Sequence, residues 1–326
     1  MIARRAFILG GTGNVGSAVA RSLARDGWDV TVGSRRSTGS EFAVVTLDRD
    51  DEGVLAVADG FDLLVDVVPF EADHAEQLLA RDVGAIVAIS SASVYADDQG
   101  RTLDEATGVD DFPELPVPIP ETQRTVNPGD ATYSTKKVQL ERRLLENERT
   151  PATIVRPCAI YGSGDRMARE WHFVKRRLDR RPYVLLSNRG SGHFHTTAAA
   201  NIGELVRRIA ARPRTGVFNC GDPDPPTVQQ IARRIGDFTE ILLPDASRLG
   251  GTPWSVPRPF LVDMAKAEQE LGYQPATTWT DAIGPQVEWL LKATHGRDWR
   301  DVLPRGAQYL SFDYDAEDQL VHSLAT

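Results

Sequence analysis

A tyrosine and a lysine four residues apart, Tyr133 and Lys137, have the side chains best suited to move a proton in this chain. In a helix, residues at this spacing project from one face, so the phenol and the ammonium would be neighbours. A phenol has an ordinary pKa of about 10, and a nearby positive charge lowers it. We therefore predict that Tyr133 is a general acid and base, and that Lys137 supplies the charge.

A third candidate, Ser91, follows the apolar run 85–89, at the carboxyl end of a predicted strand. Its hydroxyl is placed to donate a hydrogen bond to a substrate oxygen and hold it toward Tyr133. Plainer interpretations exist for all three residues. A tyrosine four residues before a lysine occurs by chance in many helices, and a serine after a strand often serves a turn.

The first apolar segment ends in a glycine-rich turn at residues 10–16. Gly10, Gly13 and Gly16 fall at intervals of three between a predicted strand and a predicted helix. This spacing permits a tight turn, close approach of backbone to a pyrophosphate, and contact of helix with strand. The N–H groups of Asn14, Val15 and Gly16 then open the helix and face the phosphates with its positive dipole end. The turn predicts a dinucleotide site.

The second predicted strand ends in Ser34, Arg35 and Arg36. An acid at this position binds the ribose 2′-hydroxyl of NAD, whereas an arginine can form paired hydrogen bonds with a 2′-phosphate. We therefore predict NADP as the cofactor, bound by Arg35 and Arg36, with NAD as the alternative. Asp48, after the predicted strand 42–47, is placed to meet the adenine. The competing interpretation is that both arginines are solvated surface charges.

The elements that must position these residues alternate between strand and helix patterns. Apolar strands are predicted at 7–9, 42–47, 61–68, 85–89 and 152–155, separated by helical patterns such as 71–79 and the segment from Tyr133. This alternation indicates βαβ units and an α/β fold, a Rossmann-type doubly wound parallel sheet with a smaller C-terminal substrate-binding α/β domain.

The predicted organisation follows from that pattern. Residues 1–162 form the dinucleotide-binding domain, with a strand returning near 216–220; residues 163–293 form mainly the substrate-binding domain, and residues 294–326 a C-terminal tail. The loop 97–132 contains five prolines and no clear period, so we expect it to cover the substrate. The sequence leaves open whether the tail is docked or partly ordered.

Composition narrows the classes of partner. The 37 Lys and Arg against 46 Asp and Glu give a net charge of −9, which argues against a general nucleic-acid or anionic-membrane surface. The two cysteines lie in apolar runs, so we expect no disulfide framework and a cytoplasmic location.

His193 and His195 alternate, but they have no carboxylate or cysteine at ligand spacing. We therefore expect them in a substrate pocket or on a strand surface, and no metal.

Four motifs stand in a fixed order along the chain: Gly10-x-x-Gly13-x-x-Gly16, Ser90 to Tyr95, Tyr133-x-x-x-Lys137, and Arg156-Pro157 followed by Tyr161-Gly162. Together they resemble the extended short-chain dehydrogenase/reductase family, in its NAD(P)-dependent epimerase/dehydratase group, over most of the chain up to about Leu291. The resemblance implies that Ser91, Tyr133 and Lys137 are the catalytic triad and that Pro157 lies near the nicotinamide. It also implies a homodimer formed through helices that flank the sheet.

Two departures from the family pattern bear on the substrate. Dehydratases of the family carry an acidic pair directly after the catalytic Ser or Thr, whereas Ala92 and Ser93 offer no acid, so dehydration is disfavoured. Relatives that act on nucleotide sugars hold the diphosphate with an arginine just before an aromatic residue. The comparable run, 192–197, has no arginine, and the aspartate that often follows is replaced around Ala200.

These observations predict an NADP(H)-dependent oxidoreductase that transfers hydride between the nicotinamide and a carbonyl or secondary alcohol of a small molecule. The first alternative is a nucleotide-sugar epimerase that retains NAD(P). The second is a non-catalytic, nucleotide-sensing or RNA-associated binding protein. The complete Ser91, Tyr133 and Lys137 set and the net charge of −9 count against this last class.

Overall fold

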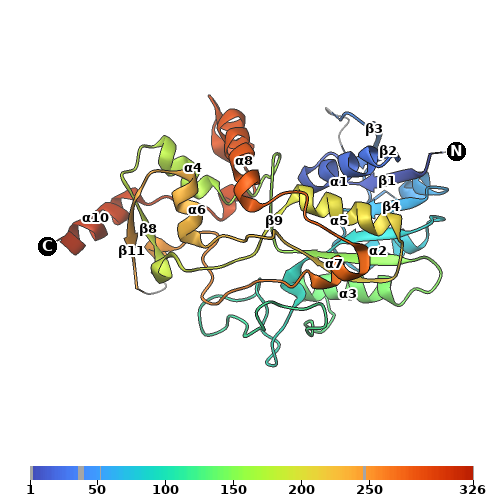
Figure 1. The fold of residues 1–326 in the computed structure, drawn as a ribbon, viewed down its shortest axis with the longest axis horizontal. Coiled ribbons are helices and arrows are strands. Elements are labelled where there is room, and N and C mark those ends of the chain that lie inside the picture. The colour runs from blue at the N-terminus through green and yellow to red at the C-terminus, as the bar shows by residue number, and fades with distance from the viewer. Residues whose placement is uncertain (1–2, 36–39, 52, 245–246, 326) are drawn as a thin grey trace.

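The computed structural model describes residues 3–35, 40–51, 53–244 and 247–325. Its centre is a seven-stranded parallel sheet in the order β10-β6-β5-β4-β1-β2-β3 (Figure 1). The strands are β1 (Arg5–Leu9), β2 (Asp29–Ser34), β3 (Ala43–Thr46), β4 (Leu63–Asp66), β5 (Ile86–Ile89), β6 (Ala152–Pro157) and β10 (Gly216–Cys220). Strand order reverses between β1 and β4, and in such sheets a ligand binds beyond the carboxyl ends at the reversal. The predicted fold class is confirmed.

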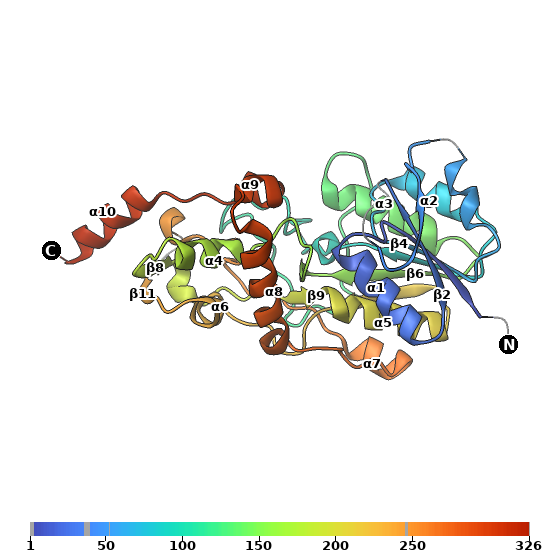
Figure 2. The same ribbon diagram turned by 90° about the horizontal axis from the view of Figure 1, so that it is seen from above.

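Helices cover both faces of this sheet because its strands are apolar on both sides. In β1, Ala6 and Ile8 pack into one core, whereas Phe7 and Leu9 pack into the other. The first core lies under α1 (Asn14–Arg25) and α5 (Ala199–Ala211), and the second under α2 (Ala72–Leu79) and α3 (Tyr133–Leu145). Figure 2 shows the sheet between these two pairs of helices.

A second lobe is built mostly from the later part of the chain and has its own apolar core. Its elements before the C-terminal tail are β7 (Ala159–Tyr161), α4 (Trp171–Leu178), β8 (Tyr183–Leu186), β9 (Thr196–Ala198), α6 (Val228–Ile235), β11 (Thr239–Leu242) and α8 (Trp279–Thr294). Strand β8 pairs with β11, and β7 with β9. Helix α7 (Ala265–Leu271) belongs to the sheet lobe, since it packs beside α5.

Helix α4 begins at Trp171, directly after a tight turn at residues 165–168. The carboxylate of Asp165 accepts hydrogen bonds from the backbone N–H groups of Met167 and Ala168, both at 2.9 Å. Ala168 then adopts a φ of +41°, which a right-handed helix does not allow. The helix therefore starts after this turn.

The C-terminal tail is docked on the second lobe rather than loose. It contains α9 (Trp299–Val302) and α10 (Tyr314–Ala325), which lies at the far end of the molecule from the N-terminus (Figures 1 and 2). Glu317 forms a buried ion pair with Arg176 at 2.5 Å, and the ring of Phe312 stacks on His172 at 6.1 Å. His172 is therefore a packing residue of this lobe.

Across the described parts of the chain, no helix has the length and apolar character needed to cross a membrane.

Candidate active site

The glycine turn has the shape that a phosphate group requires. Gly10 has a φ of +79°, and a Cβ atom on Gly16 would lie 2.3 Å from the Gly10 carbonyl oxygen, so each position needs glycine. Helix α1 follows directly, with Gly13 at its N-cap. In this fully described helix, no side chain caps the N-terminus and no acid lies in the first turn. The N–H groups of its first turn therefore fit an anionic ligand, as a dinucleotide pyrophosphate would be.

The residues predicted to bind the adenosine end lie along neighbouring strand ends. Arg35 is exposed directly after β2, and Arg36 lies outside the described residues. Asp48 follows β3, and its carboxylate accepts a hydrogen bond from the Asp50 N–H at 3.3 Å. Sequence reasoning missed Arg49, whose guanidinium pairs with the buried carboxylate of Asp66 at 2.8 Å and fixes the carboxyl end of β4.

The three predicted catalytic residues come together at the carboxyl end of β5. Ser91 lies two residues beyond this strand, and Tyr133 opens α3, whose N-cap Thr132 forms a capping box with Thr135. The Lys137 ammonium lies 5.7 Å from the centre of the Tyr133 ring. It donates hydrogen bonds to the backbone carbonyls of Pro69 and, at 3.4 Å, Ile89. Pro157 is buried at the end of the adjacent strand β6.

Burial dominates the electrostatics of this pair. Tyr133 retains 38% of its exposure, yet desolvation raises its pKa to about 12; the carboxylate of Asp104 raises it further and a hydrogen bond with Ser91 opposes the rise. Lys137 is 5% exposed, and desolvation lowers its pKa to about 8. The expectation of a lowered Tyr133 pKa is therefore wrong for the protein without a ligand, because desolvation of the phenol and the nearby carboxylate of Asp104 outweigh the groups that lower the pKa.

The proline-containing loop 97–132 packs back onto the site through polar contacts that the sequence did not indicate. Glu105 accepts hydrogen bonds from the N–H of Ser134 at 3.2 Å and from its hydroxyl at 2.9 Å, in the first turn of α3. Asp104, which precedes it, remains exposed and contacts the hydroxyl of Ser93. The loop contains three adjacent acidic pairs, at 97–98, 104–105 and 110–111, so the sequence held no signal that singled out this one.

The two histidines of the run 192–197 both contact backbone carbonyls, and the half-buried His193 has its Nε2 atom 2.8 Å from the Pro225 carbonyl oxygen. His195 is buried; its Nδ1 accepts from the Val262 N–H at 3.0 Å, so its Nε2 carries the proton and donates to the Asp222 carbonyl at 2.8 Å. Desolvation lowers the pKa of His195 to about 4, which keeps it neutral. The expectation of a pocket or strand-surface role is wrong for His195. Within the described residues, no group of three or more His, Cys, Asp or Glu side chains is arranged to hold a metal ion.

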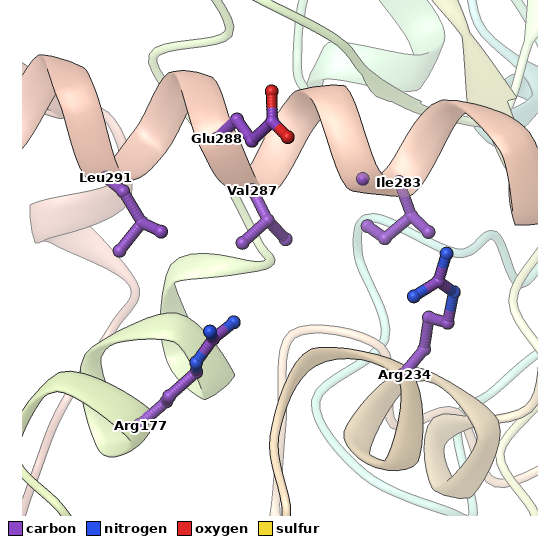
Figure 3. A pocket seen from close by; sticks show the side chains of 7 residues that line it. Arg177, Arg234, Ile283, Val287, Glu288 and Leu291 are labelled. Carbon is purple, nitrogen blue, oxygen red and sulfur yellow. The ribbon is translucent and has the colours of Figure 1, made fainter.

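A hollow of about 240 Å³ lies in the second lobe, away from the catalytic residues. Figure 3 shows it between α4, α6 and α8, with Arg177 and Arg234 reaching toward the α8 side chains. Its lining residues are Arg177, Arg234, Ile283, Gly284, Val287, Glu288 and Leu291. None of these is a residue that the sequence assigned to the site.

The comparisons with known proteins agree with this geometry. A sequence model of the NAD-dependent epimerase/dehydratase family matches residues 6–221, which contain the glycine turn and all three catalytic candidates. The chain belongs to this family. As an epimerase/dehydratase family member it is an enzyme of the short-chain dehydrogenase/reductase type, and the family uses NAD or NADP. No curated protein matches the chain.

Solved structures of epimerases share the fold at low sequence identity. UDP-N-acetylglucosamine 4-epimerase from Bacillus cereus is 16% identical, with a TM-score of 0.67 over 89% of this chain and 100% of that chain. An epimerase from Methanothermobacter thermautotrophicus is also 16% identical, with a TM-score of 0.67 over 92% and 94% of the two chains. MoeE5, solved with UDP-glucose and NAD, is 18% identical, with a TM-score of 0.63 over 88% and 99%.

Proposed function

We propose that this epimerase/dehydratase family member transfers hydride between NADP(H) and a carbonyl or secondary alcohol of a small molecule. The observation that carries the proposal is the meeting of Ser91, Tyr133 and Lys137 beside the strand ends that follow the glycine turn. When bound, the nicotinamide supplies or accepts the hydride. The chain's own residues would hold the cofactor, orient the reacting oxygen and move its proton.

The proposed roles follow from exposure and charge. Tyr133 is accessible to a substrate, and with a pKa of about 12 its phenol is protonated at neutral pH, so it can donate a proton to a carbonyl oxygen. Ser91 would donate a hydrogen bond to the same oxygen. Lys137 already donates to backbone carbonyls at the ends of two strands, where its ammonium would also reach a ribose hydroxyl.

The preference for NADP rests on the end of β2. Arg35 is exposed there, and the residues before it in β2, Gly33 and Ser34, include no acid that would repel a 2′-phosphate. A guanidinium binds phosphate with paired hydrogen bonds. NADPH preference in turn favours a net reductase, since an enzyme that returns its hydride to the same substrate gains nothing from an exchangeable cofactor.

A second candidate is a nucleotide-sugar epimerase with retained NAD(P). The family match favours it, as do MoeE5, solved with UDP-glucose and NAD, and the UDP-N-acetylglucosamine 4-epimerase from Bacillus cereus. The chain lacks the family arginine in the run 192–197.

Cofactor stoichiometry separates the two candidates. The purified protein would be incubated with NADPH and a panel of small ketones and aldehydes, and separately with UDP-sugars, while cofactor absorbance and products are followed. One NADPH oxidised for each product supports the reductase. Interconversion of UDP-sugars without net cofactor change supports the epimerase and rejects the reductase. Either reaction proceeding at the wild-type rate in Tyr133→Phe rejects catalysis by this site.

A further inference from the structure

Asp104 is held beside the catalytic tyrosine by its neighbour in the chain. Glu105 is bound to both the N–H and the hydroxyl of Ser134, the residue that follows Tyr133 in α3. Thr102, from the same loop, donates a further hydrogen bond to the Glu105 carboxylate. The loop is thereby fastened to the first turn of the catalytic helix, and the charge of the exposed Asp104 side chain acts on the Tyr133 phenol and raises its pKa.

Two hydroxyl groups connect the phenol with this carboxylate. Tyr133 has a hydrogen-bond partner in Ser91, and the Ser91 and Ser93 hydroxyl oxygens lie 2.8 Å apart. Ser93 is buried at 3% exposure and is in turn the hydrogen-bond partner of Asp104. A hydroxyl both donates and accepts a hydrogen bond, so two in sequence can relay a proton. These hydrogen-bonded groups lead from the reacting phenol to a carboxylate in contact with solvent.

Charged groups from four segments of the protein surround these two hydroxyl groups. Asp104 is influenced by Glu105 from its own loop and by Arg169 from the turn before α4. Tyr133 is influenced by Asp104, by Glu141 from its own helix and by Arg305 from the C-terminal tail. Desolvation raises the pKa of Asp104 and Glu105 raises it further, while Ser93 and Arg169 oppose the rise. Asp104 therefore takes up a proton more readily than an ordinary aspartate.

We propose that Asp104 exchanges the catalytic proton of Tyr133 with solvent through the hydroxyls of Ser91 and Ser93. This inference rests on the proposed function only in taking Tyr133 as the acid and base. Asp104 acts through other residues and is therefore a positioning and relay residue. It supplies, from a loop, the acidic group that the sequence lacks at Ala92 and Ser93.

The proton steps balance without any further reactant. When Tyr133 gives its proton to a carbonyl oxygen, the phenolate takes the Ser91 hydroxyl proton, Ser91 takes that of Ser93, and Ser93 takes the proton of the Asp104 carboxyl group. Asp104 is then reprotonated from water. In the oxidative direction each transfer reverses, and one proton leaves to solvent. No electrons pass through these residues.

The test is a titration of Tyr133 that needs neither substrate nor cofactor. Tyrosine labelled with ¹³C at Cζ is incorporated, and Tyr133→Phe assigns the Tyr133 resonance. In the wild type, the ¹³C chemical shift of Tyr133, followed against pH, should change first where Asp104 ionises. This first step should lie above pH 3.9, about the ordinary aspartate pKa. Asp104→Asn should remove this step. Asp110→Asn, an exposed carboxylate in the same loop, is the matched control and should keep it.

Ser93→Ala distinguishes a relay from a simple charge effect. If the two serine hydroxyls couple Asp104 to Tyr133, Ser93→Ala should reduce the size of the first chemical-shift step of Tyr133 to less than half, although Asp104 remains charged. An unchanged step in Ser93→Ala, or no step in the wild type, overturns the proposal. Because the readout is independent of turnover, a protein with the expected titration and no activity overturns the proposed function instead. Where turnover is found, Asp104→Ala should slow it about tenfold and formate should restore it.

Discussion

The guanidinium of Arg156 in β6 forms a two-pronged ion pair with the carboxylate of Glu141 in α3, with Nε to Oε1 at 3.1 Å and Nη2 to Oε2 at 2.5 Å. Both side chains are buried. Glu141 lies one turn beyond Lys137, so the pair joins the helix that carries the catalytic residues to the central sheet. The guanidinium also lies 4.8 Å from the centre of the Tyr95 ring.

Glu141→Gln should destabilise the protein strongly, because it leaves a buried guanidinium without its counter-charge. We expect the free energy of unfolding to fall by about 3 kcal/mol. The measurement is urea unfolding followed by circular dichroism. Glu76→Gln is the control, since its ion pair with Arg143 is half exposed and should contribute less than about 1 kcal/mol. Equal losses of unfolding free energy in the two variants would show that burial does not decide how much each ion pair contributes.

Tyr133→Phe should remove the proton donor and leave the fold intact, because the phenol is partly exposed and its ring is retained. Turnover should fall by a factor of about 10² to 10⁴, the usual contribution of a general acid or base. Cofactor affinity, measured by fluorescence titration, should change little. A variant with wild-type turnover would exclude Tyr133 as the catalytic acid.

The parts of this molecule that the sequence could predict are those fixed by local pattern. Strands β4 and β5 were recognisable because a strand buried on both faces must be a continuous apolar run. The glycine turn was recognisable because Gly16 leaves no room for a side chain. The family resemblance is confirmed by the match over residues 6–221.

The remaining features depend on contacts between distant segments. The three-residue strands β7 and β9 exist through pairing with each other and are too short to show a period. Asp104 approaches Tyr133 because Glu105 binds Ser134, which no spacing in the sequence reveals. The spacing of Tyr133 and Lys137 indicated that they are neighbours, yet their burial, which sets both pKa values, is a property of the whole fold.

Lys137→Met should change how stability depends on pH. The pKa of Lys137 is lowered to about 8 in the folded protein, against about 10.4 when unfolded, so the unfolded chain binds more protons between these values. Stability of the wild type should therefore rise with pH across this window. Relative to Lys137→Met, the wild type should gain about 2 kcal/mol between pH 7 and pH 10, measured by urea unfolding. A constant difference would show that Lys137 is not desolvated.

Arg35→Ala should weaken NADPH binding and leave NADH binding unchanged, because the guanidinium is expected to contact the 2′-phosphate alone. Loss of a charge-assisted hydrogen bond corresponds to about 10-fold to 100-fold in affinity. Fluorescence titration with both cofactors measures the effect, and NADH serves as the internal control. Equal weakening of the two would place Arg35 elsewhere on the cofactor or indicate a damaged turn.

Gly16→Ala should disrupt the phosphate turn. The added Cβ atom would lie 2.3 Å from the Gly10 carbonyl oxygen and 2.6 Å from the Gly11 Cα, and both are backbone atoms that cannot move without opening the turn. Such overpacking costs about 1 to 3 kcal/mol, and cofactor affinity should fall at least about tenfold.

Gly284→Ala is the matched control within α8, where a Cβ meets nothing within 4 Å. It should leave cofactor binding unchanged, because α8 lies in the second lobe and outside the phosphate turn. Equal cofactor affinity in the two variants would contradict the assignment of residues 10–16 as the phosphate site.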